Sequence, residues 1–160
     1  MRLSLLICLF LSLGATAQNA TTQRADSLYQ LGNYRAAINA YSELGTPRAS
    51  LQIARAYKTS GLNAKAVEQY KDLVQKHPEQ KIARFELGKL YFQLGRFPAA
   101  AAVFQNLIQE EKGSETNPEY AYYLGRVYQQ QDSYQPALKT YARALQADSS
   151  HVRSLYQVSR

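Results

Sequence analysis

The residues of this chain that are best suited to acid–base or nucleophilic chemistry are two histidines and one cysteine. His77 and His151 stand beside Pro78 and Ser150, where links between helices are expected, so both are interpreted as solvated loop residues. Cys8 lies in the apolar start of the chain, outside the part expected to fold. The sequence therefore offers no catalytic histidine and no disulfide or thiol nucleophile in the mature protein.

Carboxylates at Glu110, Glu111, Glu115 and Glu119 are close enough in sequence to suggest a cation site. These glutamates lie along a longer polar link, however, and such links are usually solvated loops. The chain has no His-Glu-x-x-His pattern, no phosphate-cradling glycine loop and no nucleophile-elbow serine. We therefore predict a protein that is not an enzyme and that holds no metal or other cofactor.

The first 17 residues have the pattern of a secretion signal. Arg2 precedes a run from Leu3 to Leu13 that is almost wholly apolar, and Ala15-Thr16-Ala17 fits a cleavage site that would leave Gln18 as the new N-terminus. The run is shorter than the roughly 18 to 20 apolar residues that cross a bilayer. We expect a signal peptide at 1–17, export to the periplasm or outside the cell, and no stable membrane insertion after cleavage. The alternative is an uncleaved membrane anchor.

The chain has 160 residues, the size of one ordinary domain, and a formal net charge of +7. A basic balance favours acidic partners. Lysines and arginines are spread evenly from Arg24 to Arg160, without the cluster that a phosphate-tracking surface needs. Nucleic acid is therefore not an expected partner.

One phrase returns four times in the mature chain: a small turn residue, an aromatic residue soon after it in most copies, then alanine, an apolar residue and a second aromatic residue. Gly61 and Gly95 are 34 residues apart, and the other two intervals bracket that value. The four copies are Gly32-Asn33-Tyr34 with Ala37, Ile38 and Tyr41; Gly61 with Ala66, Val67 and Tyr70; Gly95-Arg96-Phe97 with Ala100, Ala101 and Phe104; and Asp132-Ser133-Tyr134 with Ala137, Leu138 and Tyr141.

Each copy separates two apolar stripes of helical period, which predicts two antiparallel helices per repeat. The prolines agree with this, because a proline is tolerated in the first turn of a helix and costs roughly 3 kcal/mol in its interior. Pro47 and Pro118 would open first helices, behind the N-caps Thr46 and Asn117. Pro98 and Pro136 fall in first turns of second helices, and Pro78 falls in a link. Small residues are expected to face each other where helices approach closely: Ala54, Gly88 and Gly125 against Ala66, Ala100 and Ala137.

With four copies in register, the sequence resembles the tetratricopeptide repeat family over nearly all of the mature chain. The resemblance implies an all-α fold, a right-handed α-solenoid of antiparallel helical hairpins. In that frame a repeat domain covers 18–160, with full repeats near 18–46, 47–80, 81–117 and 118–151 and part of a fifth at 152–160. The family's usual large residue at the fourth position is replaced in this chain by Thr21, Ser50, Arg84 and Ala121.

In that family the first helices line a concave groove, and positions five and nine of each repeat point into it. Position nine is basic from the second repeat onward, whereas the first repeat has Thr22 and Asp26 at these two positions. The groove residues implied by the resemblance are Leu51, Phe85, Tyr122 and Tyr156 at position five, Arg55, Lys89, Arg126 and Arg160 at position nine, and Phe92 at position twelve. The alternative is that these cations are ordinary surface charge of a basic chain.

The resemblance and the absence of catalytic motifs predict a non-catalytic scaffold that binds a peptide or protein segment, with the basic row favouring acidic segments. The fifth repeat is expected to stop in mid-helix at Arg160, without a capping helix, unless residues 150–160 themselves form a short, frayed terminal cap. This suggests a second interpretation, that the chain is the sensory or docking front of a longer membrane receptor or enzyme. It also suggests a third, self-association through the open C-terminal end.

Overall fold

A computed structural model describes residues 18–111 and 117–159. The expected signal peptide at 1–17, Glu115 and the groove residue Arg160 lie outside these residues. In the described ranges every regular element is an α-helix and no strand occurs, which confirms the predicted all-α class. The chain divides between His77 and Pro78 into two compact units, each with its own helices and core.

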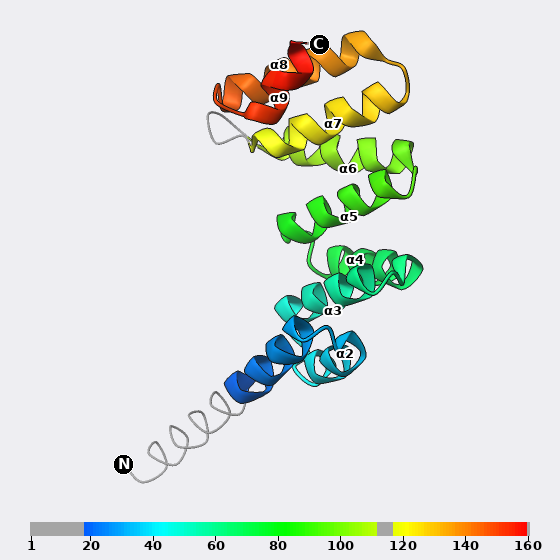
Figure 1. Cartoon of the computed structure of the whole chain (residues 1–160), viewed down its shortest axis with the longest axis vertical. Helices are drawn as coiled ribbons and strands as arrows, with labels where there is room; N and C mark the ends of the chain where they lie inside the picture. The colour runs from blue at the N-terminus through cyan, green and yellow to red at the C-terminus, as the bar shows by residue number, and fades with distance from the viewer. Residues whose placement is uncertain (1–17, 112–116, 160) are drawn as a thin grey trace, which may run out of the picture. The chain divides into compact units, whose positions relative to one another are not determined.

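Consecutive helices within each unit form antiparallel hairpins (Figure 1). The first unit has a helix described over 18–30, followed by α2 (Tyr34–Ser42), α3 (Pro47–Thr59) and α4 (Asn63–Lys76). The second unit has α5 (Lys81–Gln93), α6 (Phe97–Glu110), α7 (Pro118–Gln130), α8 (Tyr134–Ala147) and α9 (Val152–Val158). None of the helices in the described residues is long and apolar enough to span a membrane.

The small turn residue of the repeated phrase ends each first helix. Gly61 has φ +78°, and Gly32, Gly95 and Asp132 have left-handed φ values of 75°, 70° and 55°. In each case the N–H of the next residue donates to the carbonyl five positions earlier, as from Leu62 to Tyr57 at 2.9 Å. This is the helix-ending motif that glycine adopts without steric cost, and aspartate is among the few other residues that tolerate it.

The helix starts follow the sequence predictions. Thr46 and Asn117 cap α3 and α7, accepting hydrogen bonds from the N–H groups of Ala49 (3.2 Å) and Glu119 (3.0 Å). The prolines behind these two caps are the first residues of their helices, and the prolines of α6 and α8 fall in first turns. All four prolines therefore occupy places where no helical hydrogen bond is lost.

One core cluster of the first unit is built from small residues around a buried aromatic side chain. Tyr41 of α2 is 2% exposed and packs with Ala25, Ala37, Ala40, Ala49 and Ile53. Its hydroxyl donates a 2.5 Å hydrogen bond to the carboxylate of Asp26. Asp26 holds the groove position that is basic in later repeats, so in the first repeat this position is used to bind a buried phenol.

In the second unit the corresponding aromatic residues are Phe104 of α6 and Tyr141 of α8, which are 0% and 2% exposed. At two of the predicted close approaches, the atoms nearest the glycine belong to an aromatic ring. A Cβ atom on Gly88 would lie 2.7 Å from the Phe104 ring, and one on Gly125 would lie 2.6 Å from the Tyr141 ring. The glycines thus leave room for the aromatic rings of Phe104 and Tyr141, which pack directly against the first helices at these two positions.

The fifth repeat differs from the sequence expectation of a helix that stops in mid-course. Helix α9 ends at Val158, and the N–H of Ser159 donates to the carbonyl of Leu155 at 3.1 Å. It packs against α8, and Ser154 is fully buried, whereas Val152 is 75% exposed.

Candidate functional site

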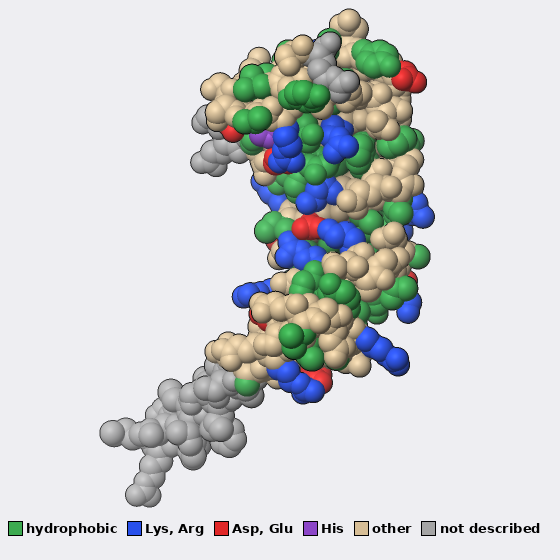
Figure 2. Space-filling view, viewed as in Figure 1, with side chains coloured by type: hydrophobic (Ala, Val, Ile, Leu, Met, Phe, Trp, Pro, Cys, Tyr) green, Lys and Arg blue, Asp and Glu red, His purple; other side chains and the backbone are tan. Residues whose placement is uncertain are grey.

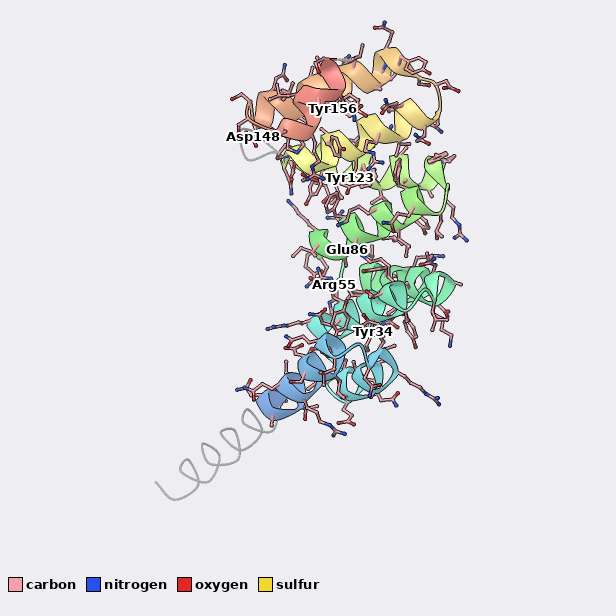
Figure 3. The ribbon with its side chains drawn as sticks, viewed as in Figure 1. Tyr34, Arg55, Glu86, Tyr123, Asp148 and Tyr156 are labelled. Atoms are coloured by element: carbon pink, nitrogen blue, oxygen red, sulfur yellow. The ribbon has the colours of Figure 1, made fainter. Side chains whose placement is uncertain are left out.

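Two of the predicted groove residues, Leu51 and Arg55, belong to the first unit. Both are half-buried on α3. A cavity of about 400 Å³ lies beside Arg55 and is otherwise lined by Asp26, Tyr29, Gln30, Tyr41 and Gln52. Figure 3 labels Arg55 within this part of the chain. The surface is polar and of mixed charge, and burial together with the bond to Asp26 raises the pKa of the Tyr41 hydroxyl far above its usual value.

The other predicted groove residues lie in the second unit, and the first of them is Phe85 of α5. Its ring is half-buried and contacts three other rings, those of Phe104, Tyr120 and Tyr123, at centroid distances of 5.9, 5.0 and 5.4 Å. The ammonium nitrogen of Lys89, one turn further along α5, lies 4.7 Å from the Phe85 ring centroid. Phe85 is therefore both a core residue and the support for a cation.

Arg126 of α7 is surrounded by aromatic rings. Its guanidinium carbon lies 4.6 Å from the ring centroid of Phe92 and 5.9 Å from those of Tyr122 and Tyr123. Tyr123, labelled in Figure 3, bridges the helices because its ring also contacts Phe92 of α5 and Phe104 of α6. Figure 2 shows Lys and Arg side chains interleaved with hydrophobic side chains on this face of the unit.

The two remaining predicted residues have opposite environments. Tyr122 is only 6% exposed, with its ring 6.0 Å from that of Tyr141. Tyr156 of α9 is 58% exposed. Arg153, at position two of the fifth repeat, places its guanidinium 5.0 Å from the Tyr122 ring centroid. Sequence reasoning missed Arg153, although its position also belongs to those that line the groove in the family resembled.

The cations of this surface are of the type that pairs with carboxylates. Neither Lys89 nor Arg126 takes part in the ion pairs formed among the described residues of the second unit. A guanidinium stacked on rings keeps its N–H edge available, and that edge matches a carboxylate in a bidentate manner. The rings beneath the cations offer apolar contact to neighbouring side chains of a ligand.

The interpretation of His151 as a solvated loop residue is wrong. Its side chain is 9% exposed, and its Nε2 lies 3.0 Å from Glu119 Oε1 while Nδ1 lies 2.8 Å from Ser154 Oγ. Arg153 pairs with the same carboxylate. Glu119 begins α7 and the other three residues begin α9, so this cluster joins the starts of two first helices. The two partners of Glu119 are 32 and 34 positions away from it, which hides the cluster from local sequence analysis.

The interpretation of the acidic link as a solvated loop is also wrong for its described residues. Glu110 is the last residue of α6 and pairs in bidentate fashion with Arg84 of α5, with both N···O distances 2.5 Å. The hydrogen bonds from Arg84 hold the pKa of Glu110 below its usual value, and the same bonds raise the pKa of Arg84. Glu111 accepts a 2.9 Å bond from the N–H of Asn117. Among the described residues no group of three or more His, Cys, Asp or Glu side chains is arranged to hold a metal ion.

Comparison with known families identifies the repeat. The tetratricopeptide repeat description matches residues 51–115 and, separately, residues 118–151, which together exceed half of the chain. The chain belongs to the tetratricopeptide repeat family. The second match covers the hairpin of α7 and α8, which contributes Tyr122 and Arg126 to the surface described above.

Solved structures of tetratricopeptide proteins share this fold. A MamA protein is 20% identical with a TM-score of 0.76, covering 88% of this chain and 78% of its own. MamA from Desulfovibrio magneticus RS-1 is 14% identical with a TM-score of 0.75, covering 88% and 81%. A tetratricopeptide repeat protein from Parabacteroides merdae ATCC 43184 is 16% identical with a TM-score of 0.78, covering 89% and 57%. A search of curated protein sequences finds no match.

At these identities the structures establish the fold alone. A tetratricopeptide fold supports a role in protein–protein interaction, because stacked hairpins present extended surfaces to a partner.

Proposed function

We propose that this protein is a non-catalytic scaffold that binds an acidic peptide or protein segment on the first helices of its repeats. The observation that carries the proposal is the set of cations held on aromatic rings in the second unit, with Lys89 on Phe85 and Arg126 on Phe92. Stacking orders these long side chains before a ligand arrives, which lowers the entropy lost on binding.

The segment would place carboxylates on Arg126 and Lys89 and apolar side chains on the half-buried ring of Phe92. Aromatic residues and arginine are the usual energetic anchors of interfaces. Arg153 and the exposed Tyr156 extend the same row onto α9. In the first unit Leu51 and Arg55 form the corresponding pair, beside the cavity at Asp26.

We further propose that the scaffold works outside the cytoplasm, in the periplasm or beyond it. The support is the sequence of residues 1–17, with its basic start, apolar run and small-residue cleavage pattern. N-terminal sequencing of the protein purified from an expressing cell tests this, since a mature chain that begins at Gln18 is expected.

The groove is tested by replacing Arg55, Lys89 and Arg126 together with Gln. The matched control replaces Arg35, Lys71 and Arg96, which are exposed cations at other places, so that both variants lose the same charge. Partners are captured from an envelope extract with wild type and both variants, and the affinity of each identified partner is then measured at two salt concentrations.

We expect the groove variant to weaken a specific partner by at least about tenfold, because each charge-assisted hydrogen bond contributes roughly 1.5 to 3 kcal/mol. The control should keep wild-type affinity, and far-UV circular dichroism should show that both variants are folded. If both variants retain the same partners with the same salt dependence, the basic row is ordinary surface charge and the proposal fails.

A further inference from the structure

A second groove lies on the second helices of the second unit, away from the aromatic and cationic row. It has a volume of about 600 Å³, within the range of ordinary ligand sites. Its floor is formed by the buried side chains of Ile108 on α6 and Leu124 on α7. Its walls carry Gln105 and Gln109 of α6 and Lys139, Thr140, Ala142, Arg143 and Gln146 of α8, with Tyr128 of α7 between them.

The polar groups of this groove are suited to an extended polypeptide. Gln105 donates a 2.9 Å hydrogen bond to the Tyr128 hydroxyl, which fixes one amide against the floor. Glutamine amides both donate and accept, so they can pair with the N–H and C=O groups of a ligand backbone. Lys139 and Arg143 are exposed one turn apart on α8, and no ion pair joins either of them to a carboxylate in the ranges that the structure describes.

The repeats provide an internal comparison for these two cations. When Ala66 of α4 is aligned with Ala137 of α8, Glu68 is equivalent to Lys139 and Asp72 is equivalent to Arg143. The surroundings are retained, because Tyr57 and Gln75 correspond to Tyr128 and Gln146 and line a cavity with Glu68 and Asp72 in the first unit. The fold therefore does not require cations at these positions. The charge at two equivalent positions is reversed while a tyrosine and a glutamine beside them are kept.

We propose that the groove between α6 and α8 is a second protein-binding site, which takes an extended acidic segment of a partner independently of the first-helix surface. Carboxylates of the segment pair with Lys139 and Arg143, its backbone pairs with the glutamine amides, and an apolar side chain contacts Ile108 and Leu124. The argument for an acidic occupant is charge complementarity in a groove whose lining contains two cations and no acidic residue.

The test follows NMR chemical shifts of the 15N-labelled full chain. The probe is an acetylated, amidated six-residue peptide of alternating Glu and Leu, and its Lys and Leu counterpart is the control peptide. We expect the acidic peptide to shift the side-chain amides of Gln105, Gln109 and Gln146 and the backbone amides of α8. Lys139→Glu with Arg143→Asp introduces the residue types found at the equivalent positions of α4. This double variant should raise the Kd of the acidic peptide, fitted from these shifts, at least tenfold.

The matched control, Lys65→Glu with Lys71→Asp on α4, makes the same change in net charge elsewhere and should leave the Kd unchanged. The Arg55, Lys89 and Arg126 triple variant should also leave these shifts intact, which separates this site from the proposed first-helix groove. The proposal is overturned by any of three results: shifts confined to α5, α7 and α9; complete displacement of the peptide by inorganic phosphate at equal ionic strength; or a concentration-dependent dimer that Lys139→Glu with Arg143→Asp abolishes, which would make a second copy the occupant.

Discussion

At the scale of single residues, the glycines inside first helices have a packing role. Gly88 and Gly125 lie in the middle of α5 and α7, where glycine is normally unfavourable by about 1 kcal/mol relative to alanine. Each lies against an aromatic ring that leaves no space for a Cβ atom. The glycine thus allows the close crossing of the two helices of one hairpin.

Gly125→Ala is therefore expected to destabilise the protein by about 1 to 3 kcal/mol, because the Tyr141 ring must shift to admit the methyl group. Urea unfolding followed by circular dichroism measures the free energy of unfolding. Helix propensity acting alone would instead make Gly125→Ala more stable than wild type by about 1 kcal/mol. An increase in stability would show that the ring moves without cost.

At the scale of helices, a hairpin is held by polar pairs as well as by its core. Arg84 stands where the family usually has a large apolar residue, and its guanidinium joins α5 to the end of α6 through Glu110. The side chain of Arg84 is 15% exposed and that of Glu110 is 44% exposed. Because the carboxylate is partly solvated, we expect the pair to contribute no more than about 1 kcal/mol.

This pair gives a pH-dependent stability. The pKa of Glu110 is lowered in the folded chain, so the unfolded chain binds a proton more readily and folding is favoured above the ordinary glutamate pKa. As the pH falls through the folded pKa, that contribution is lost. Glu110→Gln should lower the free energy of unfolding at pH 7 by up to about 1 kcal/mol and leave it almost unchanged near pH 2. An equal effect at both pH values would mean that the ion pair contributes nothing.

At the scale of the whole molecule, both compact units bury a tyrosine hydroxyl in the same place in the repeat. Burial raises the pKa of Tyr141 in the second unit to about 12, and burial together with the hydrogen bond to Asp26 raises the pKa of Tyr41 in the first unit. When folding raises the pKa of a group, that group's contribution to stability is fully present at pH values below its pKa in the unfolded chain. That stabilisation is lost as the pH rises through the folded value.

The protein should accordingly lose stability above about pH 10, the ordinary pKa of tyrosine. Each buried phenol contributes at most about 1.4 kcal/mol per pH unit to this loss. Tyr141→Phe should therefore make the fall in the free energy of unfolding between pH 10 and 11.5 less steep, as measured by urea titrations at each pH. Replacing the exposed Tyr156 with Phe is the control. An identical slope in wild type and Tyr141→Phe would refute the argument.

Much of the fold could be predicted from the sequence because its determinants are local. The spacing of apolar residues sets the helices, and Thr46, Asn117 and the prolines behind them set helix starts. Gly61 and its equivalents end first helices through hydrogen bonds that span five residues. Interactions of this range depend on neighbouring residue types, so one sequence without relatives is sufficient to recognise them.

The candidate surface was predicted less completely. Tyr122 and Tyr156 share one position of the repeat, yet one is buried and the other exposed, because α8 and α9 cover Tyr122. The functional role of the predicted groove residues remains a prediction. Arg153 was missed, because only the structure shows that its guanidinium lies 5.0 Å from the Tyr122 ring centroid.

The sequence by itself determined that this chain forms helical hairpins of the tetratricopeptide type, and where helices such as α3 and α7 begin. Only the tertiary structure decided which side chains meet, such as Arg84 with Glu110 and Glu119 with His151. The physical reason is range. Helix periodicity and capping act within a few residues, whereas these pairs join residues 26 and 32 positions apart that become neighbours only when hairpins pack.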